Sequence, residues 1–503
     1  MKKKCHYEDA NHITYILWLF IALHTLLWTL GPWFVRNSLP HDTLESITWG
    51  LQWQWGYNKH PFLAAWLSAG VYHLFGSSEW VIYLLAQLTV SLSLIATWQL
   101  AKKILPPLHA VIATLILDGV LFYNINSFHV DPDSLQLPLW ALLSLFFYQA
   151  LSTQWIRYWL TVGVITALCI MTKYQIIILI LPMTLFCFIN TQARVSFVKP
   201  GLYLAIGLAL LLLIPHASWL LHHDFITIRY ALGAPYNHQT KVHSHFGAVT
   251  WYLINCFAYV SGLFGLLWPF YGKERLSLQK IGFDQQFIIF VCLGPVCLTA
   301  LFCFINGDTV PPRWSSPYFS LLGILTLTIL KPRITPKQLK QWLVTLITFS
   351  LLLWSIRIMT FNFYMHDKSD AYLPNKMMAN AFTKLWHQHY DSPLPYLGGA
   401  HYLVASIIPY TTDKPQPYFS FDDKENPWIK NQTLMKSGGL FVWDIGENYF
   451  WDAYSPALKT LPKTIKQHFP RLIKLGSYTF YRLTPNATPI KIGVALLPPQ
   501  VSL

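Results

Sequence analysis

Long apolar runs separated by short polar segments dominate the chain from residue 13 to residue 361. A helix needs about twenty predominantly apolar residues to cross the hydrocarbon core of a bilayer. No soluble core requires such runs in repetition. The pattern therefore predicts a polytopic α-helical membrane protein with about eleven spans, at residues 13–35, 79–101, 108–124, 134–151, 157–172, 174–190, 200–220, 247–271, 284–305, 313–330 and 341–361.

The loop between the first two predicted spans, residues 36–76, has a pattern of its own. A second apolar stretch within it, Pro61 to Gly76, is too short to span easily and is expected at the membrane surface. The loop also contains a predicted helix in the plane of the membrane interface, built on four apolar residues at helical spacing: Leu44, Ile47, Leu51 and Trp55.

The composition changes after the last predicted span, since Pro, Gly, Asp and Lys become more frequent from residue 363 onward. Alternating or β-branched runs bounded by such residues are typical of strands. We predict a membrane domain at residues 1–362 and a small α/β domain outside the membrane at residues 363–503, with strands at Tyr396–Pro409, Gly439–Trp443 and Ile473–Leu483.

The overall composition supports the membrane assignment and excludes some functions. Hydrophobic residues make up 54% of the 503 residues and charged residues only 12%, against roughly 25% charged in soluble domains. The net charge of +14 is better explained by orientation beside anionic lipid headgroups than by nucleic-acid binding. All seven cysteines lie in the N-terminal tail or in predicted spans, so the C-terminal domain has no disulfide framework.

The distribution of cations predicts the orientation of the chain. Lys and Arg in short loops mark the cytoplasmic face, which places the N-terminus inside and, with an odd number of spans, the C-terminal domain outside. We predict a location in the bacterial inner membrane with the C-terminal domain in the periplasm. The residues assigned to the cytoplasmic face are Lys2, Lys3, Lys4, Lys102, Lys103, Arg157, Arg194, Lys199, Lys273, Arg275, Lys280, Lys331, Arg333, Lys337 and Lys340.

A smaller set of charges falls on the opposite, outer face against this bias. Acidic residues accompany cations there, at Asp42 and at Asp131 and Asp133. Charged groups at membrane depth are expensive and mark functional sites. The combination predicts a site for an anionic, membrane-borne ligand, formed by some of the outer cations Arg36, Lys59, Lys173, Arg229, Lys241 and Arg313.

Several outer segments carry recognisable motifs in a fixed order. They are Arg36-(x5)-Asp42, Gly56-Tyr57-Asn58-Lys59-His60-Pro61-Phe62-Leu63 with Trp66, Phe128-His129-Val130-Asp131-Pro132-Asp133-Ser134 with Trp140, Met171-Thr172-Lys173-Tyr174, and Trp219-(x4)-Asp224-Phe225-(x3)-Arg229-Tyr230. Together they resemble glycosyltransferase family 39 of the GT-C superfamily, which includes protein O-mannosyltransferases and lipid A aminoarabinose transferases. The resemblance covers roughly residues 10–330. Thr43 departs from it, because the family usually has a second acidic residue there.

The resemblance implies an enzyme with a GT-C fold that takes a sugar, a hexose or a pentose, from a polyprenyl-phosphate. The acceptor is a hydroxyl of a lipid, a glycan or a protein at the outer face of the membrane. Such chemistry needs a carboxylate to accept the hydroxyl proton and cations to hold the leaving phosphate. The resemblance assigns Asp42 as the base and Asp133 to sugar or cation contacts, and it assigns the donor phosphate to Lys59, His60, Lys173, Arg313 and Arg229.

Structural alternatives exist for some of these residues. Asp42-x-x-Glu45 has the spacing of a capping box that opens a helix. Asp131 before Pro132 is typical of a helix N-cap followed by proline at the first helical position. Lys173, at the end of a predicted span, has the length to reach the interface without binding a ligand.

No cofactor follows with certainty from the sequence, although a divalent metal is conceivable. Histidines and one aspartate gather in residues 222–245, and imidazole clusters bind zinc readily. Their spacing matches no tight ligand pattern, so we expect exposed histidines rather than a metal site: His222, His223, Asp224, His238, His243 and His245.

A transporter or flippase of lipid-linked saccharides is the alternative function. Such a protein would also be polytopic with outer cations, but it should carry functional charge near the middle of the membrane. The predicted span interiors are almost free of charge, with Arg357 near an outer end as the exception. This pattern favours the enzyme.

Overall fold

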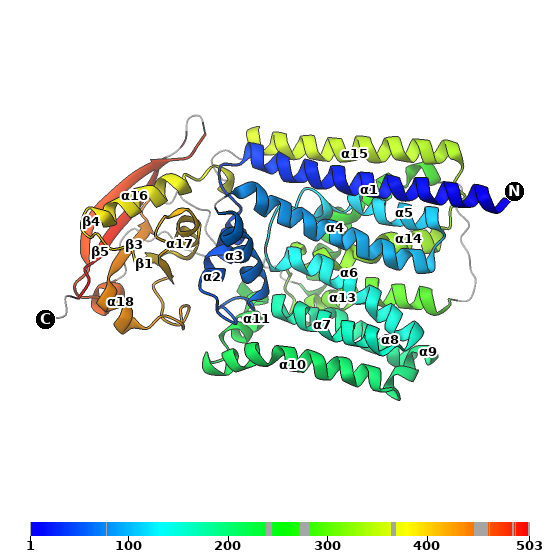
Figure 1. Ribbon diagram of the computed structural model, residues 1–503, viewed down its shortest axis with the longest axis horizontal. Coiled ribbons are helices and arrows are strands. Elements are labelled where there is room, and N and C mark those ends of the chain that lie inside the picture. The colour runs from blue at the N-terminus through cyan, green and yellow to red at the C-terminus, as the bar shows by residue number, and fades with distance from the viewer. Residues whose placement is uncertain are drawn as a thin grey trace.

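The membrane-spanning part of the chain is a bundle of long helices with a separate sheet-containing domain at one end (Figure 1). A computed structural model describes residues 2–76, 78–237, 244–271, 281–363, 369–446, 461, 463–484, 487 and 489–500. The N-terminus lies at the end of the bundle remote from the sheet domain (Figure 1). The predicted fold class, a polytopic helical protein with a C-terminal α/β domain, is confirmed.

Within the described residues, seven helices contain a stretch long and apolar enough to cross a membrane, and each overlaps a predicted span. Their apolar windows carry few charges because a lipid-facing helix cannot hydrate charged side chains. They are α1 (Lys2–Val35), α4 (Glu79–Ile104), α6 (Pro132–Thr153), α10 (Pro200–His222), α12 (His245–Leu266), α13 (Phe283–Asn306) and α15 (Pro336–Phe363).

The other four predicted spans fall on shorter or broken helices, so the count of eleven is not confirmed. Proline or short 3-10 segments interrupt three of these regions, because proline removes a backbone donor and cannot continue an α-helix. The fourth region, Ile156–Thr172, is an unbroken helix of only 17 residues. The helical segments Tyr174–Ile189 and Thr191–Phe197 meet at a bend of 97°. The elements are α5 (Pro107–Leu115), α7 (Ile156–Thr172), α8 (Ile177–Ile189), α9 (Thr191–Arg194), the 3-10 segment η6 (Pro312–Leu321) and α14 (Leu322–Leu330).

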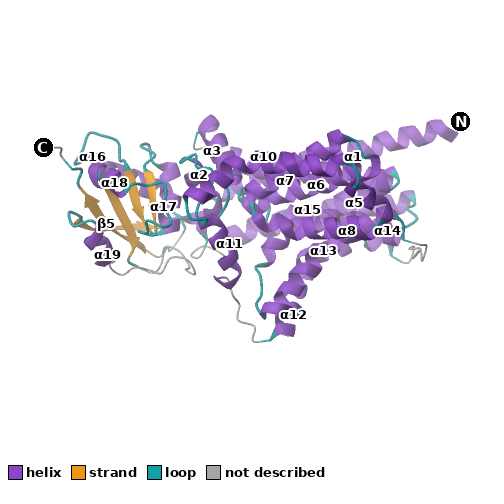
Figure 2. Cartoon of the chain, turned by 90° about the horizontal axis from the view of Figure 1, so that it is seen from below, coloured by secondary structure: helices purple, strands orange, loops and turns teal. Residues whose placement is uncertain are grey.

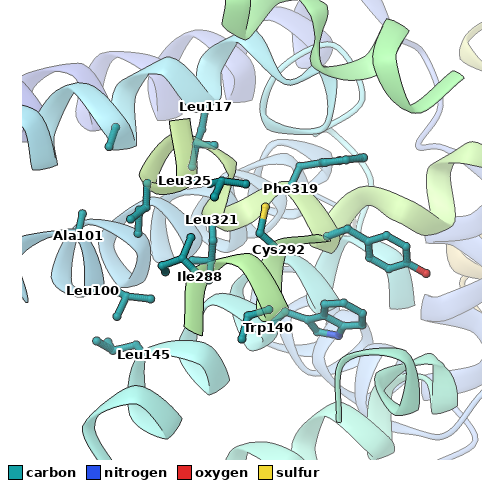
Figure 3. Close-up of a cluster of buried hydrophobic side chains, with 14 of the residues drawn as sticks. Leu100, Ala101, Leu117, Trp140, Leu145, Ile288, Cys292, Phe319, Leu321 and Leu325 are labelled. Atoms are coloured by element: carbon teal, nitrogen blue, oxygen red, sulfur yellow. The ribbon is translucent and has the colours of Figure 1, made fainter. Parts of the chain in front are cut away.

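The bundle is held by a large buried cluster in which Trp140 stacks on Tyr318, with ring centroids 5.2 Å apart. Figure 3 shows Trp140 beside Ile288, Cys292 and leucines from several helices. Small residues allow the helices to approach closely, as is common in membranes. A Cβ atom on Gly323 of α14 would lie 1.8 Å from the Ala113 carbonyl oxygen of α5, so glycine is required at this crossing.

One pair of buried polar residues corrects the expectation that the span interiors are almost free of charge. Asp118, in the predicted span 108–124, lies 3.2 Å from His24 of α1 and accepts a hydrogen bond from Ser350 of α15 at 2.5 Å. Asp118 and His24 are both buried. Neighbouring helices supply the partners that a polar group needs in lipid. The span interiors therefore do contain a charged residue, and a lack of charge there no longer argues against a transporter.

The outer loop folds into two helices, α2 (His41–Gly50) and α3 (Leu63–Phe75). The predicted interfacial helix ends at Gly50, so Leu51 and Trp55 lie beyond it. Nearly the whole of α2 is buried instead of lying on the membrane surface. The close packing of α2 on α3 is the physical reason, since a Cβ atom on Gly50 would lie 2.0 Å from the Ala65 carbonyl oxygen.

The C-terminal domain contains a mixed sheet with the strand order β2-β1-β3-β5-β4, covered by short helices (Figure 2). Strand β1 is parallel to β2 and β3, whereas β5 is antiparallel to β3 and β4. The elements are α16 (Asn375–His387), β1 (Tyr396–Gly399), α17 (His401–Ile407), β2 (Gln416–Phe419), α18 (Asn431–Ser437), β3 (Gly439–Asp444), α19 (Lys463–His468), β4 (Ile473–Tyr481) and β5 (Pro489–Leu497).

The predicted strand Tyr396–Pro409 is only partly correct, because β1 ends at Gly399 and a helix follows. Gly399 has φ +156°, and a Cβ atom there would lie 2.1 Å from the Val442 carbonyl oxygen, so this turn needs glycine. Strands β2 and β5 were not predicted. The turn directs His401, the first residue of α17, toward α2 of the membrane domain, which it reaches through Glu45.

Candidate active site

Asp42 lies in the first turn of α2 and is buried. The residue before the helix is Pro40, and no side chain caps this helix end, so the alternative interpretation of Asp42 and Glu45 as a capping box is wrong. Instead, Arg313 Nη1 donates to Asp42 Oδ2 at 2.8 Å, and His41 Nε2 lies 3.3 Å from Oδ1. Asp42 is therefore held by cations rather than by the helix backbone.

Asp133, in the first turn of α6, forms the second carboxylate of the cluster. Lys173 Nζ donates to Asp133 Oδ1 at 2.5 Å, and Arg313 Nε lies 4.0 Å from Oδ2. The Lys173 ammonium also lies 4.8 Å from the centre of the Trp314 ring. Arg313 thus bridges Asp42 and Asp133, and its side chain remains 52% exposed.

The N-cap interpretation of Asp131 agrees with the structure. Its Oδ1 accepts from the Ser134 amide at 2.8 Å, and Ser134 Oγ reciprocates toward the Asp131 backbone. Burial, together with the charges of Asp133 and Asp42, raises the pKa of Asp131 to about 6. Asp131 therefore anchors the start of α6 and leaves Asp133 facing the cations.

A cavity of about 210 Å³ is lined by Asp131, the N-cap of α6, and by Asp133 in the first turn of the helix. It combines polar groups with an aromatic and aliphatic wall, as ligand sites usually do. The residues that give it this character include Asp131, Asp133, Arg313, His129, Phe122 and Tyr259.

The ionisation of the Asp42 cluster follows from its cations. Burial alone would raise the pKa of Asp42, but the charges of His41 and Arg313 lower it well below the ordinary value. The pKa of His41 is raised because Asp42 and Asp370 outweigh the effect of burial. Asp42 is therefore ionised at neutral pH, and its proton affinity is low while both cations remain beside it.

A second ionic network joins α2 to the C-terminal domain. Lys59 Nζ donates to Glu45 Oε1 at 2.6 Å and to Tyr402 at 3.3 Å. His401 Nε2 donates to the same Glu45 oxygen, and its Nδ1 lies 3.4 Å from Glu425. Burial would raise the pKa of Glu45, but Lys59 and His401 lower it to about 2. Lys59 is thus already paired with a carboxylate.

His60 lies beside this network and is neutral at physiological pH. Burial and the charge of Lys173 lower the pKa of His60 to about 4, against the opposing effect of Glu45 and Asp133. Its ring meets Trp49 and Tyr230 edge-on. A neutral imidazole offers hydrogen bonding, rather than charge, to a phosphate.

Three residues of these two ionic networks were not assigned to the site from the sequence. Asp370, just after the membrane domain, accepts from Arg36 at 2.6 Å and lies 3.2 Å from His41 Nδ1. His41 was overlooked although it is adjacent to Asp42, and His401 lies 356 residues from its partner Glu45. For His41, the position next to Asp42 was the one local signal in the sequence.

Other predicted residues are not brought into the cluster. Arg229, on α11 (Ile226–Asn237), is exposed, and its side chain makes no hydrogen bond or ion pair with another described residue. His238, His243 and Lys241 lie outside the described residues. In the part of the chain that the structure describes, no group of three or more His, Cys, Asp or Glu side chains is arranged to hold a metal ion.

Known proteins resemble this chain in a segment of its sequence and in its fold. Residues 59–219 match the family described as dolichyl-phosphate-mannose-protein mannosyltransferase. The chain is similar to the crystal structure of ArnT from Cupriavidus metallidurans bound to undecaprenyl phosphate, with TM-score 0.60 and 13% identity over 97% of this chain and 100% of that chain. The apo structure of the same protein gives TM-score 0.58 and 12% identity over 97% and 99%. No curated protein sequence matches the chain.

Proposed function

We propose that this membrane protein, a GT-C superfamily glycosyltransferase by fold and by the match at residues 59–219, transfers a sugar from a polyprenyl-phosphate to an acceptor hydroxyl. One observation carries the proposal: two carboxylates, Asp42 and Asp133, meet on Arg313 at one end of the helix bundle, with Lys173 beside them. The matched segment contains Lys59, His60, Asp133 and Lys173. The similar ArnT structure holds undecaprenyl phosphate.

In the proposed reaction, Asp42 takes the proton of the acceptor hydroxyl. The hydroxyl oxygen forms a bond to the anomeric carbon of the sugar, and the bond from that carbon to the phosphate oxygen breaks. The electron pair leaves with the polyprenyl phosphate. Asp42 suits this role because it is ionised, is largely removed from water, and lies beside the cation proposed to hold the leaving phosphate.

Arg313 and Lys173 are the proposed partners of the leaving phosphate. Guanidinium forks bind phosphate in a bidentate manner, and the 52% exposed side chain of Arg313 has room to turn from Asp42 to a ligand. Removing that charge from Asp42 would raise the pKa of the carboxylate and strengthen it as a base. Donor binding would then prepare the base for proton transfer.

Lys59 and His60 have more limited roles in this proposal. Lys59 keeps Glu45 and Tyr402 as partners, so a phosphate would have to compete with a carboxylate for it. His60 is neutral and supplies at most a hydrogen bond. Asp133 is proposed to orient Lys173 and the sugar hydroxyls.

We propose a hexose or pentose donor sugar, an acceptor from the lipids, glycans or proteins of the cell envelope, and a location in the bacterial inner membrane with the site facing the periplasm. The opposite positions of the N-terminus and the C-terminal domain (Figure 1) support that orientation. A reporter enzyme fused after the last residue of the full chain should be active only outside the cytoplasm. Activity in the cytoplasm would contradict the outer site.

Donor binding gives a second test. Removing one charge-assisted hydrogen bond costs about 1.5–3 kcal/mol, so Arg313→Gln and Lys173→Met should each weaken binding of undecaprenyl phosphate by about 10- to 150-fold. Binding is measured with purified protein in detergent. The Arg229→Gln variant, which removes a cation outside the cluster, should change affinity by less than about twofold. Equal losses in all three variants would extend the donor site along α11 and contradict the proposed position.

A further inference from the structure

A second and larger cavity lies at the opposite end of the helix bundle from Asp42. Its volume is about 1310 Å³, and it opens where α1, α5, α13 and α14 come together, near the N-terminal end of the bundle (Figure 1). The sugar-transfer chemistry proposed above uses none of its residues. A cavity of this size exceeds the roughly 300–1,000 Å³ typical of small-ligand sites.

The walls of the cavity are mainly apolar. Ile13 and Ile16 of α1 face it from one side, and Leu108, Leu327 and Leu339 contribute from α5, α14 and α15. Water forms few favourable contacts with such walls. A hydrocarbon chain bound there would remove apolar area from water, which stabilises the complex by roughly 25 cal/mol per Å². The favoured occupant is therefore a molecule with a long apolar part.

The rim of the cavity adds positive charge. Lys331 and Arg333 line it, and neither side chain forms a hydrogen bond or ion pair with another described residue. Among the lining residues the acidic side chain is Asp284, whose Oδ1 accepts from Tyr148 at 2.8 Å. Two cations with no ionic partner among the described residues, against one partnered carboxylate, complement an anionic headgroup.

Three helix N-termini at the cavity also favour an anionic ligand. The first residues of α5, α13 and α15, namely Pro107, Phe283 and Pro336, all line the cavity. The free amides of a helix N-terminus favour negative charge. Two helix C-termini also end nearby, but Lys331 follows the last residue of α14 and neutralises that end. The cations and the apolar walls carry the argument, and the helix N-termini reinforce it.

We propose that this cavity binds an anionic phospholipid from the membrane leaflet opposite the active site. The headgroup phosphate would contact Lys331 and Arg333, and the acyl chains would lie against Ile16 and Leu339. The cavity is at the end of the bundle that holds the cations predicted to face the cytoplasm, where anionic lipids attract basic residues. This proposal is independent of the sugar and the acceptor.

Native mass spectrometry of the full chain, loaded with phosphatidylglycerol or with phosphatidylethanolamine, tests the proposal. Phosphatidylglycerol should be retained at least several-fold more than the zwitterionic lipid. The double variant Lys331→Gln with Arg333→Gln should lose at least about fivefold of that occupancy. The matched control, Lys337→Gln with Lys340→Gln, removes the same charge from exposed residues outside the cavity and should retain the lipid.

Two further experiments test whether the acyl chains contribute to binding, and melting curves test whether the variants are folded. Leu339→Trp, which places a bulkier side chain on the cavity wall while leaving both cations in place, should also lower occupancy. Glycerol phosphate without acyl chains should fail to displace the lipid. Equal retention of the two lipids, an equal loss in the control variant, or displacement by glycerol phosphate would overturn the proposal. Melting curves of every variant in detergent establish that each remains folded.

Discussion

Replacing Asp42 by asparagine is expected to lower the rate of sugar transfer by about 10²–10⁴-fold, the usual contribution of a positioned general base. The base acts only as the hydroxyl loses its proton, so the chemical step should suffer more than binding. Asparagine has nearly the shape of aspartate, and Arg313 keeps Asp133 as a partner. The variant should therefore fold and bind undecaprenyl phosphate within a few-fold of the parent.

Transfer is measured with purified protein and a polyprenyl-phosphate sugar, alongside donor binding. Asp391→Asn, the same chemical change at an exposed residue of the C-terminal domain, should leave the rate unchanged. Asp133→Asn should cause a smaller loss than Asp42→Asn if Asp133 only orients Lys173 and the sugar. If transfer by Asp42→Asn stays within a few-fold of the parent, Asp42 merely holds Arg313 and Asp133 becomes the leading base.

Replacing Glu45 by glutamine is expected to destabilise the protein by about 3–5 kcal/mol at pH 7, because it leaves the buried Lys59 without its carboxylate. The side chains of Glu45 and Lys59 are only 5% and 12% exposed. The same variant weakens the contact between α2 and α17, since His401 also bonds Glu45. Denaturant titration in mild detergent gives the free energy of unfolding.

The stabilisation of the folded protein by Glu45 depends on pH in a direction that the pKa of Glu45 sets. The pKa of Glu45 is lowered from its ordinary 4.5 to about 2 in the folded protein. Its stabilisation is therefore fully present above about pH 4.5 and is lost as the pH falls toward 2. The difference in melting temperature between parent and Glu45→Gln should shrink over that range.

Glu425→Gln is the matched control for this prediction. Glu425 contacts the other nitrogen of His401 at 3.4 Å, but its side chain is 35% exposed. Exposed ion pairs contribute about 0–1 kcal/mol, so this variant should cost at most that amount. Equal losses in the two variants would mean that the His401 contact, rather than the pairing of Lys59, stabilises the interface.

The sequence identified many of the residues of the candidate site but not their partners. Asp42, Asp133 and Lys173 were named from motifs, and Arg313 was named as a cation, all on one predicted face of the membrane. Their pairing depends on tertiary structure, since Arg313 and Asp42 are 271 residues apart. The contributions of Asp370 and His401 were not predicted, because no local pattern relates a residue of the C-terminal domain to a loop of the membrane domain.

Hydropathy by itself determined the membrane class and seven of the predicted spans. Each span is specified locally, because transfer into lipid depends on the apolar residues and internal hydrogen bonds of one segment. Only the tertiary structure decided which helices stay short, where α2 ends against α3, and which carboxylate faces which cation. These features depend on close packing and on charge pairs between distant segments, and pairing energies of that kind leave no periodic trace along a chain.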